Sequence, residues 1–401
     1  MVAFTLEVST TEKCNLACPY CYVANEDNYL TPEMFDSSWE EFKTLVDRAP
    51  VTNNEYQVSF FGGEPLLNRE LMDYAVKNYY GPDPKCKHIT VISNLSLIDE
   101  DFIEWKNENN VGVSWSFDGI SSNASRPLIK SMQENAGFES VLDMYNDKRH
   151  LIKEVLGNNR FCKVMIFPGN TDKMTENLEF LVDLGMNCPD FMPVRDDIWS
   201  QEDLHLFRKE CRRLADRVIE YFAEGKIIAV GMFYLAIRDI LLGMTKSKRP
   251  FGCFAATHGA ILSVNGKFYP CARFNSKKLL PMVGKEFNFD YWNKTLNPQN
   301  FDKCKSCRLY KVCNAGCSYS QIRNNNQPVD SVCEINHMYY DDTLRINEEC
   351  KDMPAYQEYV QNLFTGKFRT FKSEVEFSDI YGLIKKHKVG MAAIEAERVA
   401  A

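Results

Sequence analysis

The sequence predicts an α/β protein in which a partial, TIM-like (β/α)6 barrel precedes a small cysteine-rich domain. Six short β-rich runs alternate with helix-like segments, and the unusual local motifs of that region directly follow these runs. Seven cysteines then crowd the stretch from Cys253 to Cys333. Strands that alternate with helices form parallel βα units. Six such units fit an incomplete barrel, and an open doubly wound sheet is the alternative.

The predicted strands are rich in β-branched and aromatic residues and cover residues 4–9, 57–61, 89–93, 111–117, 162–167 and 190–194. The predicted helices have amphipathic or polar patterns and cover residues 32–46, 68–80, 138–156 and 201–223. The expected domains are the barrel at 1–222, bridging helices at 223–250, the cysteine-rich domain with a β-hairpin at 251–340, and a helical C-terminal tail at 341–401.

Composition excludes several classes of protein. The 401 residues are 45% hydrophobic and 25% charged, as in an ordinary globular protein, and the net charge of −8 comes without a basic tract. Nucleic acid and an anionic membrane are therefore not expected as partners. The N-terminus lacks a secretory signal, and no apolar run reaches the ~20 residues of a membrane span, which predicts a cytoplasmic protein. In that compartment fifteen cysteines indicate metal ligands rather than disulfides.

Three cysteines lie close together near the start of the chain, in the run CNLACPYCY. Cys14, Cys18 and Cys21 have the spacing C-x3-C-x2-C. A structural zinc site usually has four ligands in two separated pairs, and zinc remains the alternative here. Three thiolates on one short loop instead suit a cubane iron–sulfur cluster in which one iron has no protein ligand. That iron is open to a substrate or a cofactor.

The predicted barrel places other motifs beside this triplet, because active-site groups in such folds gather at the carboxyl ends of the strands. Gly62 and Gly63 follow the second predicted strand, and two consecutive glycines let the backbone approach a ligand closely. The groups that follow the first four predicted strands are Cys14 to Cys21, Gly62-Gly63-Glu64, Ser93-Asn94 and Asp118-Gly119.

These motifs together resemble the radical S-adenosylmethionine (radical SAM) superfamily, whose defining motif is C-x3-C-x2-C with an aromatic residue, here Tyr20, before the last cysteine. The resemblance implies that the triplet binds a [4Fe–4S] cluster whose open iron is chelated by SAM. Gly62-Gly63-Glu64 is similar to the family's GGE motif, which holds the methionine amino group of SAM. Ser93 and Asn94 stand where relatives often carry Thr-Asn-Gly, with Leu95 in place of the glycine. The other SAM contacts that the resemblance implies are Tyr20 near the adenine, and Ser116 and Arg126 at the ribose and the methionine carboxylate.

The second cysteine cluster carries a more specific pattern. The run ILSVNGKFYPC predicts a hairpin with a two-residue turn at Asn265-Gly266, which folds Cys271 back toward the start of the region. The layout resembles the SPASM domain of radical SAM enzymes that act on peptides and proteins, and a zinc ribbon is the structural alternative. By that resemblance auxiliary cluster I binds Cys253, Cys271 and Cys317, and auxiliary cluster II binds Cys304, Cys307, Cys313 and Cys333.

Auxiliary cluster I has one thiolate fewer than cluster II. His258 is a candidate fourth ligand, because imidazole replaces thiolate in some clusters, and a site open to peptide or solvent is the other interpretation. Sulfatase-maturing relatives carry an aspartate directly after the cysteine that ends the hairpin, whereas this chain has Ala272. Formylglycine formation would lose its evident proton acceptor here.

As a whole, the resemblance implies a radical SAM enzyme that modifies a peptide or protein, with three [4Fe–4S] clusters and SAM as cofactors. A 5'-deoxyadenosyl radical would take a hydrogen from a peptide residue, and the outcome would be a thioether, another crosslink or an epimerised centre. The alternatives are sulfatase maturation, dehydrogenation of a small molecule, and a non-enzymatic electron-transfer or metal-storage protein. The Gly-Gly-Glu motif argues against the last of these. Expected partners are the peptide and an electron donor such as flavodoxin or ferredoxin. No recognition domain precedes Cys14, so a leader peptide would be recognised by a separate protein or by the cysteine-rich domain itself.

Overall fold

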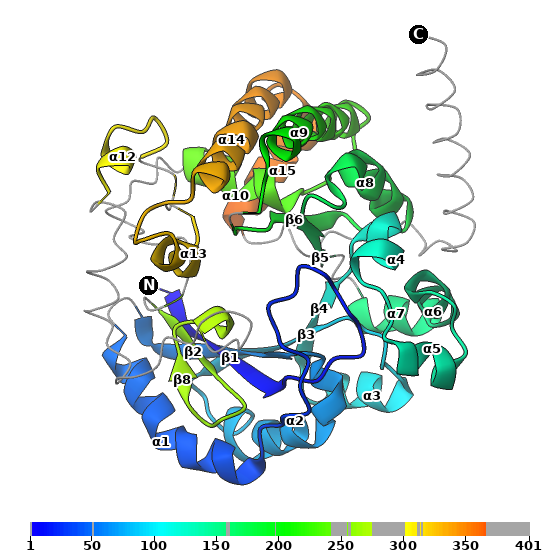
Figure 1. Cartoon of the computed structure of the whole chain (residues 1–401), viewed down its shortest axis with the longest axis vertical. Helices are drawn as coiled ribbons and strands as arrows, with labels where there is room; N and C mark the ends of the chain where they lie inside the picture. Colours follow the sequence, from blue (N-terminus) through cyan, green and yellow to red (C-terminus); the bar gives the residue numbers. More distant parts are fainter. Residues whose placement is uncertain are drawn as a thin grey trace. The chain divides into compact units, whose positions relative to one another are not determined.

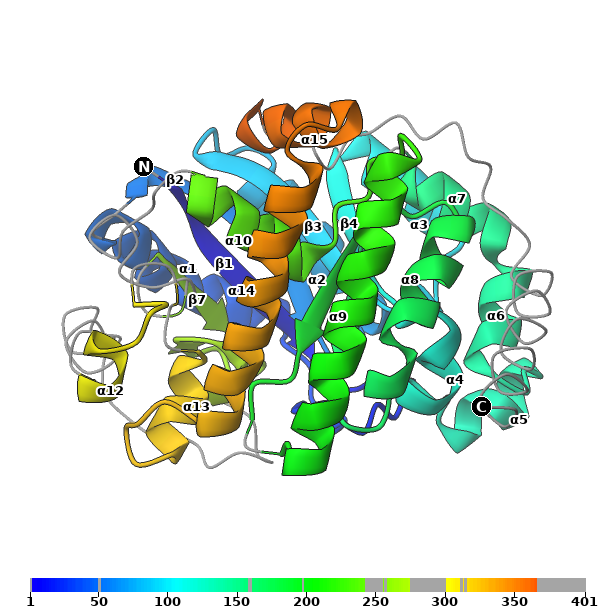
Figure 2. The same ribbon diagram turned by 90° about the horizontal axis from the view of Figure 1, so that it is seen from above.

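The computed structural model describes residues 2–49, 52–157, 161–196, 198–241, 255, 258–274, 301–310, 313 and 316–365. By its contacts the chain divides into two compact units. Unit 1 consists of Met1–Ser114 and Met244–Cys333. Unit 2 consists of Trp115–Gly243 and Glu334–Ala401. Figure 1 and Figure 2 show the elements of each unit in two views. No helix in the described ranges is long and apolar enough to cross a membrane.

Unit 1 contains a mostly parallel sheet. Its strands are β1 (Val2–Thr11), β2 (Thr52–Gly62), β3 (Cys86–Ser93), β7 (Gly259–Leu262), β8 (Phe268–Tyr269) and the first residues of β4 (Val111–Ser116). β1 pairs in parallel with β2 on one side and with β7 on the other, and β2 pairs in parallel with β3. β8 pairs antiparallel with β7. The carboxyl ends of β1, β2 and β3 therefore share one edge, which collects the residues that follow them.

The first helices of unit 1 connect its strands, and the last ones follow β8. They are α1 (Pro32–Arg48), α2 (Arg69–Ala75) with a π-helical extension at Val76–Tyr80, α3 (Glu100–Glu108), α12 (Asp302–Lys305) and α13 (Ser318–Arg323), with 3-10 turns at Pro65–Asn68 and Ala272–Phe274. α1 begins at the predicted residue because Thr31 Oγ1 accepts a hydrogen bond from Met34 N and Pro32 occupies the first turn. Figure 1 shows α1 and α2 next to each other along the outer side of the strands.

Unit 2 contains the end of β4 and the parallel strands β5 (Phe161–Ile166) and β6 (Cys188–Pro193). Its helices are α4 (Ser122–Ser125), α5 (Lys130–Ala136), α6 (Val141–Asp147), α7 (Arg149–Leu156), α8 (Met174–Asp183), α9 (Gln201–Ala223), α10 (Gly231–Leu241), most of α14 (Asp330–Cys350) and α15 (Pro354–Thr365), with 3-10 turns at Gly119–Ser121 and Thr171–Lys173. Figure 2 shows α8, α9 and α14 side by side, and Arg212 of α9 pairs with Asp342 of α14 at 3.0 Å.

The predicted fold class is confirmed, since all six predicted strands are present and a parallel α/β sheet precedes the cysteine-rich region. The predicted helix at 138–156 is two helices, because the backbone of Lys148, between α6 and α7, leaves helical geometry. α10 lies in the predicted bridging segment. α14 runs through the predicted boundary at 340/341, and the domain boundaries stay predictions. Cys253 and the last part of the predicted tail, 366–401, lie outside the described residues.

The predicted hairpin is present, but its turn differs from the prediction. Beyond the last pair of β7 and β8, Ser263 N donates to Lys267 O at 3.0 Å, and Gly266 N donates to Ser263 O at 2.9 Å. Gly266 has φ +73°, whereas Asn265 is not among the described residues with positive φ. A two-residue type I′ turn needs positive φ at both central residues, so the loop has three residues and ends in a left-handed glycine.

Candidate active site

The cysteine triplet forms a loop that leaves the carboxyl end of β1. Cys14 N donates to Asn25 Oδ1 at 2.7 Å, and Cys21 N donates to Cys18 O at 3.1 Å. Burial raises the pKa of the Cys14 thiol to about 12, and the charges of Glu64, Cys18 and Cys21 add to the rise. The three thiols therefore lie close enough to influence one another's ionisation, and Glu64 lies near them.

The thiols of this loop fit an iron–sulfur cluster by their chemistry. A thiol with a raised pKa stays protonated until a metal ion displaces its proton. Within the described ranges, no group of three or more Cys, His, Asp or Glu side chains already converges on a metal position. Cluster assembly therefore has to deprotonate the thiols and draw them together.

Gly62 and Gly63, at the end of β2, bring that strand against the start of the cysteine loop. Gly63 N donates to Thr11 O at 2.7 Å, and Glu64 N donates to Lys13 O at 2.9 Å. A Cβ on Gly62 would overlap Thr11 O, and a Cβ on Gly63 would overlap Lys13 O. The neighbouring backbone therefore requires glycine at positions 62 and 63, whether or not a ligand also approaches.

The Glu64 carboxylate is buried and joins the ends of β2 and β3. Its Oε1 accepts from Ser93 Oγ at 2.7 Å and from Leu66 N at 3.2 Å, and its Oε2 accepts from Asn94 N at 2.8 Å. Burial raises the pKa of Glu64 to about 7, although these hydrogen bonds lower it. Three of the predicted site residues, Glu64, Ser93 and Asn94, are therefore brought together.

Two further polar side chains complete this network, and sequence reasoning missed both. Asn15, inside the cysteine triplet, accepts from Asn94 Nδ2 at 2.9 Å and donates to Ser96 Oγ at 2.6 Å. Ser96 N donates to Asn94 Oδ1 at 2.8 Å. The network ties the cysteine loop to the segment after β3. The available signal was a polar residue directly after Cys14 in an otherwise apolar run.

Leu95 has an unusual backbone conformation between these polar residues. Its φ is +60°, in the left-handed region that favours glycine, and its side chain is fully buried. This position therefore has a backbone conformation that glycine favours while holding a leucine.

Ser116 and Arg126, the predicted ribose and carboxylate contacts, belong to unit 2. Arg126 is buried, and its Nη2 donates to Asp118 Oδ1 at 2.9 Å. Asp118 also accepts from Ser125 Oγ at 2.7 Å and from Met165 N at 2.8 Å. The Arg126 guanidinium thus has a partner within its own unit. Ser116 and Tyr20 are partly exposed, and all three SAM contacts stay predictions.

The thiols expected at auxiliary cluster II lie near one another. Burial raises the pKa of Cys333 to about 11, the charges of Cys313 and Cys304 add to the rise, and Lys303 lowers it. Cys307 N donates to Cys304 O at 3.1 Å. The binding of one cluster by these four cysteines stays a prediction.

Two thiols expected at auxiliary cluster I, Cys271 and Cys317, lie next to Arg273. Cys271 precedes it by two residues, and Arg273 Nη1 donates to Cys317 Sγ at 3.3 Å. Burial is the main cause of the raised pKa of Tyr22, and the charges that act on this phenol include Cys271, which raises its pKa, and Arg273, which lowers it. His258, the candidate extra ligand, pairs through its backbone with β1, and its role stays a prediction.

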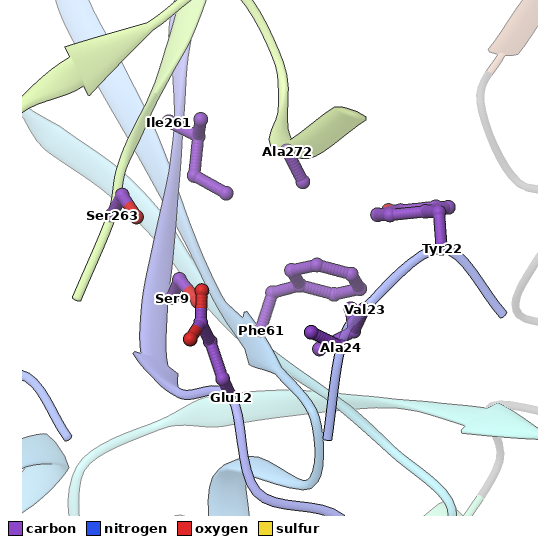
Figure 3. A pocket seen from close by; sticks show the side chains of 9 residues that line it. All are labelled: Ser9, Glu12, Tyr22, Val23, Ala24, Phe61, Ile261, Ser263 and Ala272. Atoms are coloured by element: carbon purple, nitrogen blue, oxygen red, sulfur yellow. The ribbon is translucent and has the colours of Figure 1, made fainter. Parts of the chain in front are cut away.

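A small cavity in unit 1 lies between the cysteine loop and the hairpin. Its volume of about 20 Å³ is enough for one water molecule. Figure 3 shows the Glu12 carboxylate beside Ser9 at one edge, with Tyr22 and Ala272 on the other side. Sequence reasoning missed Glu12, and its signal was an acidic residue two positions before Cys14. The lining residues are Ser9, Glu12, Tyr22, Val23, Ala24, Phe61, Ile261, Ser263 and Ala272.

Comparison with known proteins places the site in a family. Residues 8–197 match the family model described as the Radical SAM superfamily. An uncharacterized protein of Methanocaldococcus jannaschii is 32% identical over 123 residues, which are 29% of this chain and 40% of that protein. A cysteine-type anaerobic sulfatase-maturating enzyme of Clostridium perfringens is 22% identical over 353 residues, which are 81% of this chain and 90% of that enzyme.

Two solved structures share the fold. Native anSMEcpe with bound AdoMet and Cp18Cys peptide aligns with 88% of this chain and 99% of its own, with a TM-score of 0.64 and 17% identity. Streptococcus suis SuiB bound to precursor peptide SuiA aligns with 82% of this chain and 76% of its own, with a TM-score of 0.53 and 18% identity.

The parallel sheet, the cysteine triplet and the family match together define an α/β enzyme of the radical SAM class. Residues 8–197 are a radical SAM domain, and the chain is homologous to anaerobic sulfatase-maturating enzymes. The predicted family and the prediction of an enzyme are confirmed. Radical SAM domains use SAM and a [4Fe–4S] cluster, so both cofactors follow from the family.

Proposed function

We propose that this enzyme is a maturase that modifies a peptide or protein by radical chemistry, forming a thioether or other crosslink or an epimerised centre. The cavity in unit 1 carries the proposal, because Tyr22, beside Cys21, and Ala272, beside Cys271, line the same space. A substrate group there would lie between two cysteine sites. The peptides bound to anSMEcpe and SuiB, which share the fold, support a peptide substrate.

The proposal assigns the SAM-binding cluster to Cys14, Cys18 and Cys21. When bound, this cluster and SAM supply the radical that removes a hydrogen atom from the substrate. The Glu64 carboxylate already accepts from three donors of the chain, so the backbone carbonyls beside it are the proposed acceptors of the methionine ammonium. Glu64 itself then holds the segment after β3 in place. The proposed contacts with the rest of SAM are Tyr20, Ser93, Asn94, Ser116 and Arg126.

The proposal also includes two auxiliary clusters, one held by Cys253, Cys271 and Cys317 and the other by Cys304, Cys307, Cys313 and Cys333. The proximity of Cys304, Cys313 and Cys333 and the position of Cys271 and Cys317 beside Arg273 support these two groups. The proposed partners are flavodoxin or ferredoxin as electron donor and a separate protein that recognises the leader peptide, and the proposed location is the cytoplasm.

Glu12 is the proposed proton acceptor. The residue is 8% exposed and lines the cavity, and its Oε2 accepts from Asn28 Nδ2 at 2.7 Å. Among the described residues, Glu12 Oε1 has no hydrogen-bond donor. An oxygen without a donor in the protein is available to a donor from a ligand. Loss of a hydrogen atom and a proton leaves the substrate oxidised, with one electron to pass on, and Glu12 would take the proton.

Sulfatase maturation is the second candidate function, favoured by the similarity to the Clostridium perfringens enzyme. Ala272 argues against it, because it stands where those relatives carry the aspartate that accepts a proton. Glu12 offers a carboxylate in the same cavity and would have to take over that role.

The test uses enzyme reconstituted without oxygen, reduced, and given SAM with two kinds of peptide. These are peptides encoded by short reading frames beside the gene, and a sulfatase-derived peptide that contains the target cysteine or serine. We expect a gene-neighbour peptide to increase 5'-deoxyadenosine and to change in mass by loss of hydrogen or in stereochemistry. Modification of the sulfatase peptide alone would establish the second candidate, and no response to either would contradict both.

Glu12 is tested in the same assay by conservative substitutions. Glu12→Gln should lower modified peptide more than 5'-deoxyadenosine, because hydrogen abstraction does not need the base. Glu12→Asp should restore part of the ratio of product to 5'-deoxyadenosine. An unchanged ratio in Glu12→Gln would show that the proton goes elsewhere.

A further inference from the structure

Arg273 lies in the short turn that links the hairpin to the second cysteine region. The turn closes directly after the hairpin cysteine, since Phe274 N donates to Cys271 O at 3.1 Å. Phe274 is fully buried and packs edge-on against Tyr319 of α13, with ring centroids 5.1 Å apart. This packing anchors the turn on α13 and carries the Arg273 side chain to the first residues of that helix.

The guanidinium group contacts side chains of α13 and of its N-terminal cap, and it also lies 6.0 Å from the ring centroid of Tyr22. Arg273 Nη1 donates to Cys317 Sγ at 3.3 Å and to Ser320 Oγ at 3.2 Å. The guanidinium carbon lies 4.9 Å from the ring centroid of Tyr319, within the range of cation–π attraction. These contacts fix a positive charge beside the sulfur of a residue that is expected to bind a cluster.

We propose that Arg273 raises the reduction potential of auxiliary cluster I, so that this cluster accepts the electron left by substrate oxidation. The inference rests on the proposed function, in which Cys253, Cys271 and Cys317 bind that cluster. Hydrogen bonds to cluster sulfurs and nearby charge are established determinants of iron–sulfur potentials. The reduced cluster carries one more negative charge, so a nearby cation stabilises the reduced state more than the oxidised state.

Oxidation of the substrate leaves one electron, and auxiliary cluster I is its acceptor. The substrate loses one hydrogen atom to the SAM-derived radical and one proton to a base. The single electron that remains passes to the oxidised cluster, which is reduced by one electron. A higher potential makes that transfer more favourable.

The experiment measures cluster potentials in a parent in which Cys14, Cys18 and Cys21 are replaced by Ala, so that only auxiliary clusters remain. EPR-monitored potentiometry without oxygen needs neither SAM nor peptide. At a fixed applied potential, we expect Arg273→Met to raise the ratio of oxidised to reduced cluster about tenfold for one of the auxiliary clusters. That change equals a fall of about 59 mV in the reduction potential of a one-electron couple. Arg273→Lys, which keeps the charge, should recover part of the shift.

The matched control is Arg323→Met, which removes an exposed positive charge from the end of the same helix. An unchanged potential in Arg273→Met, or an equal shift in Arg323→Met, would overturn the inference. If Arg273→Met fails to load a cluster, the same measurement is made on Arg273→Gln, which keeps N–H donors without charge. A lower potential in Arg273→Gln would support the inference, and an unchanged potential would overturn it. A parent without any auxiliary cluster would instead contradict the proposed function.

Discussion

Glu64 is an acid held in a site that disfavours its charge. Burial raises the pKa of Glu64 to about 7 in the folded protein, whereas a glutamate in an unfolded chain titrates near 4.3. The folded state therefore binds this proton more tightly than the unfolded state. The resulting stability is fully present below pH ~4.3 and is lost as the pH rises through about 7. The loss is on the order of 4 kcal/mol, at about 1.4 kcal/mol for each pKa unit.

We therefore predict that Glu64→Gln flattens the pH dependence of stability in this window. The measurement is denaturant unfolding of the metal-free protein under reducing conditions at a series of pH values between these limits. Glu70→Gln, which removes an exposed carboxylate of α2, is the control and should keep the dependence of the parent. Equal slopes for Glu64→Gln and the parent would mean that Glu64 does not carry the effect.

Leu95 provides a second test at a single residue. At an ordinary position glycine is less stable than alanine, because it loses more backbone entropy on folding. At φ +60° the preference reverses, since the left-handed conformation costs a residue with a Cβ roughly 1 kcal/mol. We predict that Leu95→Gly is more stable than Leu95→Ala by about 0.5–1 kcal/mol, although both lose the buried side chain.

The control for Leu95 is the same pair of substitutions at Leu71. Leu71 is equally buried but lies in α2, where glycine should be less stable than alanine by about 1 kcal/mol. Unfolding free energies of the four variants give the two differences directly. The same sign at both positions would refute the argument from backbone conformation.

At the scale of elements, the end of β2 is docked on the cysteine loop by Gly63. A Cβ added to Gly63 would overlap Lys13 O and come within 2.7 Å of Glu12 O. Both are backbone atoms, so neither can move aside as the end of a flexible side chain could. We predict that Gly63→Ala lowers the free energy of unfolding by roughly 1–3 kcal/mol even without SAM, as overpacking does.

Gly225 is the matched position for this prediction. A Cβ on Gly225 meets nothing within 4 Å, so Gly225→Ala pays only for its φ of +79°, about 1 kcal/mol. Denaturant unfolding of the metal-free variants compares the two. A Gly63→Ala variant as stable as the parent would show that the docking is loose and that the glycine serves a ligand alone.

The elements were predictable where the signal is local. The six strands and the helices α1, α2, α6, α7 and α9 follow from runs of β-branched residues and from helical periodicity, whereas α3 and α8 were not predicted. The turn of the hairpin was not, because Asn265-Gly266 is compatible with more than one turn type and the pairing of β7 and β8 decides between them.

The same distinction applies to the site. The cysteines and Gly62-Gly63-Glu64 carry recognisable spacing. Asn15 and Ser96 lie 81 residues apart and meet only through the fold. Glu12 has no motif, and its importance depends on the cavity that β1, β2 and the hairpin enclose.

At the scale of the whole molecule, ten cysteines divide into a group of three in the radical SAM domain and a group of seven in the C-terminal half. The other five cysteines have no such spacing, and Cys350 is fully buried in α14. Cubane clusters contain four iron atoms each, so three clusters predict about twelve iron per chain after anaerobic reconstitution.

We predict that replacing Cys14, Cys18 and Cys21 with Ala removes about four of these iron atoms, together with all SAM cleavage, and leaves the auxiliary clusters. Replacing Cys304 and Cys333 should remove a different set of about four, because both thiols belong to the expected cluster II. Cys350→Ala is the control and should retain all iron. The measurements are iron and sulfide analysis and 5'-deoxyadenosine formation. Stoichiometric zinc without iron in protein purified without oxygen would contradict the assignment of every cluster. A total of about four iron atoms per chain would be consistent with the radical SAM cluster alone and would contradict both auxiliary clusters.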